Sequence, residues 1–484
     1  MLDQAEYKRL TVAGTTDRKK KSALGQFMTP STVATFMADL FEIEPRDPIH
    51  LLDAGAGLGA LSSAFLNRIS GKNPVRADLF EIDEHIIPHL SEVLAQHSEQ
   101  GFDISIRQED YIEVGTNMAV GHKRPYTHAI LNPPYKKIAT ASWHRLELRR
   151  AGLETVNLYS GFVGLAIEAL ARGGQMVVII PRSFTNGPYY MPFRKLLLSL
   201  CAIRRMHLFD ARNKAFKDDA VLQETIILHL ERDGTQGDVQ VSRSTDDSFD
   251  DIELFSVPFT EIVQPSDRDQ FIHVPLNGDI SALEQVLLRR ASISELGLKV
   301  STGPVVDFRM REYLHAAPGG PGTIPLLYPT HFRDLRLEWP IDGKKPNAIT
   351  FDDDTAKWMY PNGWYAVCRR FTAKEERRRV VAGVIDPRVL GEAVAIGIEN
   401  HVNVYHLGKR GMSETLAKGI ATYLNTTAVD EHFRRFNGHT QVNASDLKSL
   451  PYPILADLEK LGTWAIQTND YSQDAIDQAF GKLS

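Results

Sequence analysis

The sequence Ala129-Ile130-Leu131-Asn132-Pro133-Pro134-Tyr135 joins a short apolar run to an amide, two prolines and an aromatic ring. Apolar residues that stop at Pro-Pro predict a buried strand ending in a loop, because proline cannot donate a hydrogen bond to a sheet. The prolines also restrict the residue before each of them, so the loop is stiff. It is predicted to present the Asn132 side-chain oxygen, the Pro133 carbonyl and the Tyr135 ring at a sheet edge, which suits a planar ligand with an amino group. A proline-rich turn after a core strand is the alternative interpretation.

Apolar runs that predict strands alternate with helical patterns on both sides of this stretch. The predicted strands are residues 50–54, 77–82, 104–106, 129–131, 175–181, 204–209 and 224–230, and helices are predicted near 30–40, 61–66, 86–94 and 161–171. This alternation predicts an α/β fold with a doubly wound, mostly parallel sheet, whose ligands gather at the carboxyl ends of the strands. The last two runs have no obvious long helix between them and can form an antiparallel edge.

The domain organisation is predicted from shifts in composition. Residues 1–22 are polar and basic and are expected to form an N-terminal arm. Residues 23–240 carry the βα alternation. Five acids between Ser244 and Glu253 predict a solvated linker over residues 241–264. The alternation is lost in residues 265–484, which are expected to form an α+β domain.

Length and composition set further limits. A chain of 484 residues has room for two or three domains, and its net charge of −6 does not by itself indicate a polyanionic partner. The two cysteines, Cys201 and Cys368, lie far apart, which argues against a disulfide framework or a structural zinc site and fits the cytoplasm. No stretch approaches the roughly 18 apolar residues of a membrane span, so no membrane segment is expected. The cysteine spacing likewise gives no reason to expect a metal.

Acidic residues follow three successive predicted strands. The turn Asp53-x-Gly55-x-Gly57-x-Gly59 brings backbone close to a ligand, but its spacing differs from the G-x-G-x-x-G of dinucleotide sites. Glu81 at the end of the second strand can bind a ribose diol. Asp110 and Tyr111, after the third, can bind an adenine amino group and ring. Each acid alone could be a helix cap or surface charge, but three at neighbouring strand ends favour a cofactor site.

The order G-Q-F-x-T-P, D-A-G-A-G-x-G, E-I-D, D-Y and N-P-P-Y over approximately residues 23–235 resembles the gamma-class adenine-N6 DNA methyltransferases of restriction-modification systems. The resemblance implies a Rossmann-like methyltransferase domain, S-adenosylmethionine as methyl donor, and a C-terminal target-recognition domain. Asp53 stands where some relatives have Glu, a conservative difference. Carried over position by position, the implied cofactor site comprises Thr29, Asp53, Gly55, Gly57, Glu81, Ile82, Asp110 and Tyr111.

The chemistry of adenine methylation explains the loop. An exocyclic adenine amine is a weak nucleophile, because its lone pair is delocalised into the ring. Asn132 and the Pro133 carbonyl can each accept an N–H bond and favour a pyramidal nitrogen aimed at the methyl group. The base must leave the duplex, and Tyr135, after Pro134, would stack on it. The resemblance implies a second aromatic, for which the order along the chain selects Phe216; a buried loop anchor is the alternative.

Basic and polar clusters in the C-terminal half predict contacts with double-stranded DNA, because Arg and Lys bind phosphates and Asn, Gln and Arg read base edges. A solvated charged helix is the alternative interpretation of the cluster at residues 369–379. The polar cluster Glu399-Asn400-His401-Val402-Asn403 is of the same base-reading kind. The predicted DNA-binding residues are Arg369, Arg370, Lys374, Arg377, Arg378, Arg379, Asn403, Arg434, Arg435, Asn437, Gln441 and Asn443.

Three rival functions remain at this point. N-P-P-Y also occurs in methyltransferases of RNA and of protein glutamine, although those usually lack the leading T-P helix and so large a C-terminal domain. A nuclease-methylase fusion is disfavoured, since no acid-acid-lysine cluster is evident. A DNA-binding protein without catalysis is disfavoured by the complete loop and glycine turn. The expected enzyme is a monomer or weak dimer whose cognate restriction endonuclease is a separate chain.

Overall fold

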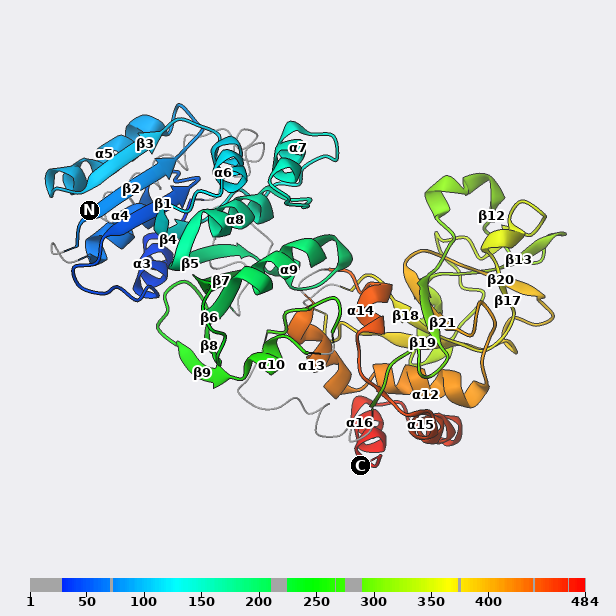
Figure 1. Ribbon diagram of the computed structural model, residues 1–484. Helices are drawn as coiled ribbons and strands as arrows, with labels where there is room; N and C mark the ends of the chain where they lie inside the picture. Colours follow the sequence, from blue (N-terminus) through cyan, green and yellow to red (C-terminus); the bar gives the residue numbers. More distant parts are fainter. Residues whose placement is uncertain are drawn as a thin grey trace. The chain divides into compact units, whose positions relative to one another are not determined.

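The computed structural model describes residues 28–69, 73–209, 224–265, 267–274, 290–372, 376–437, 440–468 and 470–483. They belong to two compact units, Met1–Gly278 and Asp279–Ser484 (Figure 1). The predicted basic arm, Phe216 and Lys374 lie outside the described residues.

The described residues of the first unit build a nine-stranded sheet in the order β3-β2-β1-β4-β5-β7-β6-β8-β9 (Figure 1). Its strands are β1 (Ile49–Ala54), β2 (Val75–Phe80), β3 (Asp103–Arg107), β4 (Tyr126–Leu131), β5 (Leu170–Pro181), β6 (Cys201–Phe209), β7 (Thr225–Arg232), β8 (Val239–Ser244) and β9 (Glu253–Val257). Neighbours among β1 to β5 pair in parallel, whereas β7 is antiparallel to both β5 and β6. The predicted doubly wound, mostly parallel sheet with an antiparallel edge is therefore confirmed.

Helices cover both faces of this sheet. They are α3 (Ser31–Asp39), α4 (Ala60–Arg68), α5 (Ile87–Glu99), α6 (Tyr111–Val120), α7 (Trp143–Arg150), α8 (Leu158–Ala169), α9 (Met191–Leu200) and α10 (Phe259–Ile262). Successive residues of a strand point to opposite faces. In β4, Ala129 and Leu131 pack into the core formed with α6, α8 and α9, while Ile130 packs with α3, α4 and α5. The continuous apolar run therefore reflects a strand buried on both sides.

The prediction of a solvated linker over residues 241–264 is wrong. β8 pairs in parallel with β6, and β9 pairs antiparallel with β8, so this region extends the sheet. Val239, Val241 and Val257 are buried, whereas the acids lie in and around the connection between the two strands. The acidic residues indicate the turn between β8 and β9. The alternation of apolar and polar residues that begins at Val239 indicates the strand itself and is the stronger signal. The units divide later, between Gly278 and Asp279.

The second unit is α+β, as predicted. Its described strands form a four-stranded sheet (β11-β21-β18-β19), a five-stranded sheet (β12-β16-β13-β20-β17) and the pairs β14-β15 and β10-β22. The strands are β10 (Arg290–Ala291), β11 (Lys299–Thr302), β12 (Leu314–His315), β13 (Thr323–Leu327), β14 (Phe332–Arg333), β15 (Arg336–Leu337), β16 (Ala348–Thr350), β17 (Tyr360–Pro361), β18 (Tyr365–Arg369), β19 (Ala382–Ile385), β20 (Ala395–Ile398), β21 (Val402–His406) and β22 (Tyr452–Pro453). The helices are α12 (Glu414–Leu424), α13 (Thr427–Phe436), α14 (Ala444–Lys448), α15 (Leu455–Gln467) and α16 (Gln473–Gly481). Among the residues described in both units, no helix is long and apolar enough to cross a bilayer.

Candidate active site

The loop after β4 is fixed at both ends. The Asn132 Nδ2 donates a hydrogen bond to the Thr29 Oγ1, 3.0 Å away. The Tyr135 hydroxyl donates to the carbonyl of Ile179 in β5 at 3.1 Å, and the Tyr135 ring meets that of Tyr159 edge-on at 6.2 Å. Thr29 lies just before α3 but does not cap it, since the helix begins at Ser31 without a side-chain cap. Its hydroxyl instead accepts the hydrogen bond from the side-chain amide of Asn132, which lies 103 positions further along the chain.

The glycine turn after β1 is held against the end of β2. Gly55 and Gly57 have φ values of 82° and 54°, a region that L side chains rarely adopt. The Glu81 carboxylate accepts hydrogen bonds from the backbone N–H of Gly57 at 2.9 Å and of Asp83 at 2.8 Å. Burial raises the pKa of Glu81 above its ordinary value. The turn and the predicted ribose-binding acid are thus adjacent.

Asp53 lies in the interior rather than on the wall of a pocket. It is fully buried, and its Oδ2 accepts a hydrogen bond from the Ser62 hydroxyl in α4 at 2.6 Å. Burial raises the pKa of Asp53 to about 7, and the neighbouring Glu81 adds to the rise. The expectation that the Asp53 side chain lines the cofactor pocket is therefore corrected: its carboxylate ties the glycine turn to α4.

Asp53→Asn is expected to make stability less dependent on pH. The folded-state pKa of about 7 lies above the ordinary 3.8, so the stabilisation from the protonated acid is complete below 3.8 and is lost as pH rises through 7. Asparagine stays neutral, so the variant should gain up to about 4 kcal/mol over wild type between pH 4 and 8. Urea unfolding of both proteins across this range measures the difference. A difference that does not vary with pH would contradict the burial of an ionising Asp53.

Asp110 is bonded through both of its oxygens. It caps α6, where its Oδ1 accepts from the backbone N–H of Ile112 at 2.9 Å, and its Oδ2 lies 3.0 Å from the His144 Nε2. The ring of Tyr111 is buried between Phe80, at 5.3 Å, and Phe162, at 5.4 Å. An acid and an aromatic wall therefore stand side by side after β3.

These groups surround one pocket at the carboxyl edge of the sheet. It contains about 870 Å³ of space, part of it open to solvent. Its lining includes the predicted Gly55, Gly57, Glu81, Ile82, Asp110, Tyr111, Asn132 and Pro134, and also Met28, Phe80, Glu109, Lys136, His144, Leu158 and Phe162, which were not predicted as site residues. The mostly apolar lining with a few polar groups is typical of a small-molecule site.

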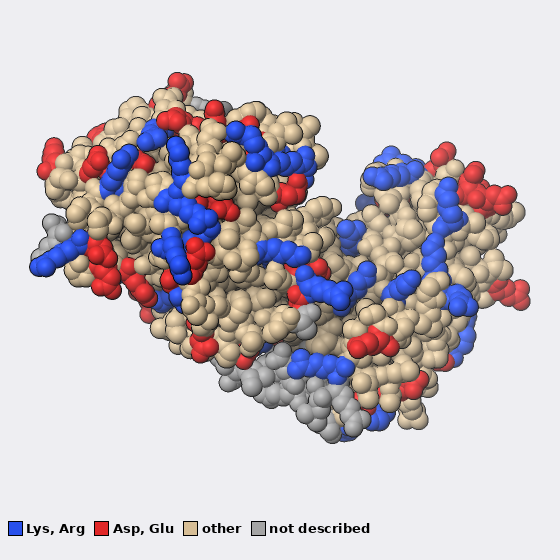
Figure 2. Space-filling view, in the orientation of Figure 1, with Lys and Arg blue, Asp and Glu red and all other residues tan. Residues whose placement is uncertain are grey.

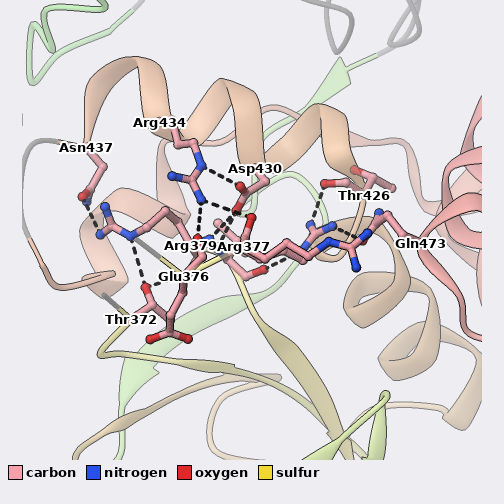
Figure 3. Close-up of polar contacts among 11 residues, drawn as sticks. Thr372, Glu376, Arg377, Arg379, Thr426, Asp430, Arg434, Asn437 and Gln473 are labelled. Atoms are coloured by element: carbon pink, nitrogen blue, oxygen red, sulfur yellow. Dashed lines mark hydrogen bonds and ion pairs between the residues drawn. The ribbon is translucent and has the colours of Figure 1, made fainter. Parts of the chain in front are cut away.

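Several arginines of the second unit form hydrogen bonds within the fold (Figure 3). Arg379 is 1% exposed, and its guanidinium donates to the Thr372 hydroxyl at 3.2 Å and to the Asn437 Oδ1 at 3.1 Å. The Arg434 Nε donates to the Asp430 Oδ2 at 2.8 Å. Asp430 also accepts the backbone N–H of Arg379 at 2.6 Å. These contacts connect α13 to the segment after β18.

Several predicted DNA-binding residues are thus structural. Arg379, Asn403 and Asn437 are buried, and a buried polar group bonded within the fold cannot also contact phosphate or bases. Asn403 donates to the carbonyl of Val442, and Asn443 begins α14 through a capping box. Arg378 donates to the carbonyl of Thr426. For the three buried residues the prediction of DNA contact is corrected to a structural role. Figure 2 shows that Lys and Arg side chains on the visible surface are interspersed with Asp and Glu.

Arg379→Ala is expected to lower the free energy of unfolding by about 2–4 kcal/mol, because it leaves buried acceptors without their donor. Arg377, two positions earlier, is exposed, and Arg377→Ala should change stability by less than about 0.5 kcal/mol. Urea denaturation of the two variants measures both effects. Equal stability of the two variants would contradict the structural role of Arg379.

Comparisons with known proteins agree with this site. A family model described as Eco57I restriction-modification methylase matches residues 25–216. The Type II methyltransferase M.BsuBI of Bacillus subtilis is 47% identical over 494 residues, covering 100% of this chain and 98% of the relative. The Type II methyltransferase M.PstI of Providencia stuartii is 40% identical over 481 residues, covering 96% and 93%. The solved structure of the type IIL restriction-modification enzyme MmeI in complex with DNA aligns with a TM-score of 0.54 at 10% identity, over 100% of this chain and 74% of that one.

The sheet order, the glycine turn and the loop at residues 132–135 define a methyltransferase. The whole-length relatives make the class specific: the chain belongs to the gamma-class adenine-N6 type II methyltransferases of restriction-modification systems.

Proposed function

We propose that this chain transfers a methyl group from S-adenosylmethionine to the N6 amine of an adenine flipped out of double-stranded DNA, as a modification enzyme. The observation that carries the proposal is the fixed amide of Asn132. Its nitrogen donates to Thr29, so its oxygen is the part of the amide suited to accept an amine hydrogen. Because M.BsuBI and M.PstI match over nearly the whole chain, the alternative of an RNA or protein-glutamine methyltransferase is not favoured.

The pocket residues fit S-adenosylmethionine. Glu81 offers a carboxylate for the ribose hydroxyls, beside the close backbone approach of Gly57. Ile82 is 55% exposed although it is a large apolar residue, and it lines the pocket where an adenine ring would cover it. Asp110 supplies an acceptor for the adenine amino group. The bound cofactor supplies an electrophilic methyl group on a sulfonium.

The loop residues prepare the nucleophile. The Asn132 oxygen and the Pro133 carbonyl each accept one N–H of the target amine, which withdraws its lone pair from the ring and aims it along the transfer direction. Proline stiffness keeps both acceptors in place, so little reorganisation is needed at the moment of reaction. Positioning of this kind can supply a large part of the rate enhancement.

The target base is held by stacking. Tyr135 is anchored through its hydroxyl to Ile179, which leaves its ring in a defined orientation next to Pro134. A flipped base loses its stacking in the duplex and recovers part of it on such a ring. We assign Phe216 as the opposing aromatic; it lies outside the described residues.

The second unit is assigned to target recognition, with DNA contacts from those predicted residues that are described and not buried: Arg369, Arg370, Arg377, Arg378, Arg434, Arg435, Gln441 and Asn443. A cognate restriction endonuclease would be a separate chain in the same cytoplasm, and the methyltransferase would act as a monomer or weak dimer.

Transfer from cofactor labelled in its methyl group to plasmid DNA, total RNA and a protein extract tests the proposed function. Label is expected in DNA. Label confined to RNA or protein would overturn the proposal.

A further inference from the structure

Two aromatic side chains of the second unit lie exposed beside each other. Phe371 is 40% exposed and the side chain of His401 is 42% exposed, and their ring centroids lie 4.8 Å apart. Phe371 follows the end of β18, and His401 precedes β21. These strands are antiparallel neighbours, with Arg369 opposite Val402, so the pair stands at one end of the four-stranded sheet.

The backbone around this ring pair is rigid. Glu399 to Val402 form a turn closed by a 3.0 Å hydrogen bond from the Val402 N–H to the Glu399 carbonyl. The Arg370 N–H donates to the His401 carbonyl at 2.8 Å, and the Val442 N–H donates to the Arg370 carbonyl at 2.7 Å. These bonds join the segments around Arg370, His401 and Val442, which are distant in sequence, at one end of the four-stranded sheet.

A buried acid orients the histidine. The Glu399 side chain is 0% exposed, and its hydrogen bonds among the described residues both go to His401: Oε2 accepts the backbone N–H at 2.9 Å, and Oε1 accepts from Nδ1. Burying a carboxylate is costly unless it is paired, and the two hydrogen bonds to His401 supply that pairing and hold the imidazole in one orientation. With Nδ1 bonded, Nε2 is the ring nitrogen available to a ligand, and it has no hydrogen-bond partner within the described part of the chain.

Arg370 supports the other ring. Its guanidinium carbon lies 5.6 Å from the Phe371 ring centroid, while Nη1 donates to the Asn400 carbonyl at 3.2 Å and Nη2 to the Gln441 Oε1 at 3.4 Å. The guanidinium thus braces the turn that carries His401 and orients Gln441, whose amide nitrogen remains a donor.

We infer that Phe371 and His401 contact base edges of the DNA target, with Glu399 as a positioning residue. This inference rests on the proposed function. The His401 Nε2 provides a hydrogen bond to a base edge, and the Phe371 ring provides an apolar surface of the kind that meets a thymine methyl group in the major groove. A fixed turn presents both groups without conformational search, which favours discrimination between base pairs over general phosphate binding.

The test compares wild type with His401→Ala, Phe371→Ala and Glu399→Gln on a library of random duplexes, with methylated adenines located by sequencing. Arg388→Ala is the matched control: the Arg388 guanidinium carbon lies 4.7 Å from the Trp364 ring centroid, and Trp364 is at the opposite end of β18 from Phe371. His401→Ala and Phe371→Ala are expected to lower kcat/KM on the preferred site by about ten- to hundredfold and to relax selectivity at one or two base pairs. Glu399→Gln should have a smaller effect and add nothing in the His401→Ala background.

Affinity for S-adenosylhomocysteine should be unchanged in every variant, because the cofactor pocket lies in the first unit, and a wild-type urea unfolding curve shows that the second unit is folded. Wild-type selectivity in His401→Ala and Phe371→Ala would overturn the inference alone. A uniform loss on all sequences with a shallower salt dependence would also overturn it, because that result indicates phosphate contact. If the wild type methylates no DNA, the proposed function fails together with the inference.

Discussion

Asn132→Ala is expected to lower methyl transfer to DNA by about 10²–10³-fold while leaving the affinity for S-adenosylhomocysteine nearly unchanged. The magnitude follows from removal of one preorganised hydrogen-bonding group that acts mainly in the transition state. Cofactor affinity should persist because Glu81 and Asp110 supply the acceptors proposed for the cofactor. Asn132 also lines the pocket, but its side-chain nitrogen donates to Thr29. Single-turnover rates with a saturating cofactor separate chemistry from binding.

Asn117→Ala is the matched control. Asn117 is an exposed asparagine of α6 whose side chain bonds Arg150, and its replacement should leave the rate unchanged. Full activity of Asn132→Ala, or a loss that equals its loss of cofactor affinity, would refute the assigned role.

Gly462→Ala is expected to destabilise the second unit by about 3 kcal/mol or more. A Cβ at Gly462 in α15 would lie 1.8 Å from the Thr415 carbonyl oxygen of α12, and a Cβ at Gly419 in α12 would lie 1.9 Å from the Leu458 oxygen. The two helices therefore cross in backbone contact, and a methyl group can fit only if they separate. This outweighs the gain of about 1 kcal/mol that alanine normally gives within a helix.

Gly481→Ala controls for helix propensity, because a Cβ at that last residue of α16 meets nothing within 4 Å. It should leave stability unchanged or slightly raised. Urea denaturation gives the unfolding midpoints, and similar midpoints for the two variants would contradict the close crossing of α12 and α15.

The catalytic half was predictable because its signals are local. Each strand of the parallel sheet is a short apolar run followed by a functional residue, and parallel topology brings the strand ends to one edge. The strand pattern therefore predicts that Asn132, Glu81 and Asp110 lie together, and all three line the pocket. His144 was missed, because its bond to Asp110 spans 34 positions and no periodicity indicates it.

The second unit was less predictable, because charge does not reveal burial. Arginines are usually exposed, so a dense basic run favours a DNA-binding surface. Arg379 is instead buried by partners such as Asn437, 58 positions away. The same limitation concealed the ring pair of Phe371 and His401, which belong to segments 30 residues apart and meet only through the pairing of β18 with β21.

The reaction proposed at the loop of residues 132–135 is methylation of the N6 amine of adenine in DNA by S-adenosylmethionine. Its most direct test is chromatography and mass spectrometry of nucleosides from plasmid DNA incubated with the enzyme and S-adenosylmethionine bearing a deuterated methyl group. We expect deuterated N6-methyladenine as the sole labelled nucleoside, with its amount lowered by about 10²–10³-fold when Asn132 is alanine. Label in a methylated cytosine, or no label in DNA while RNA or protein is methylated, would contradict it.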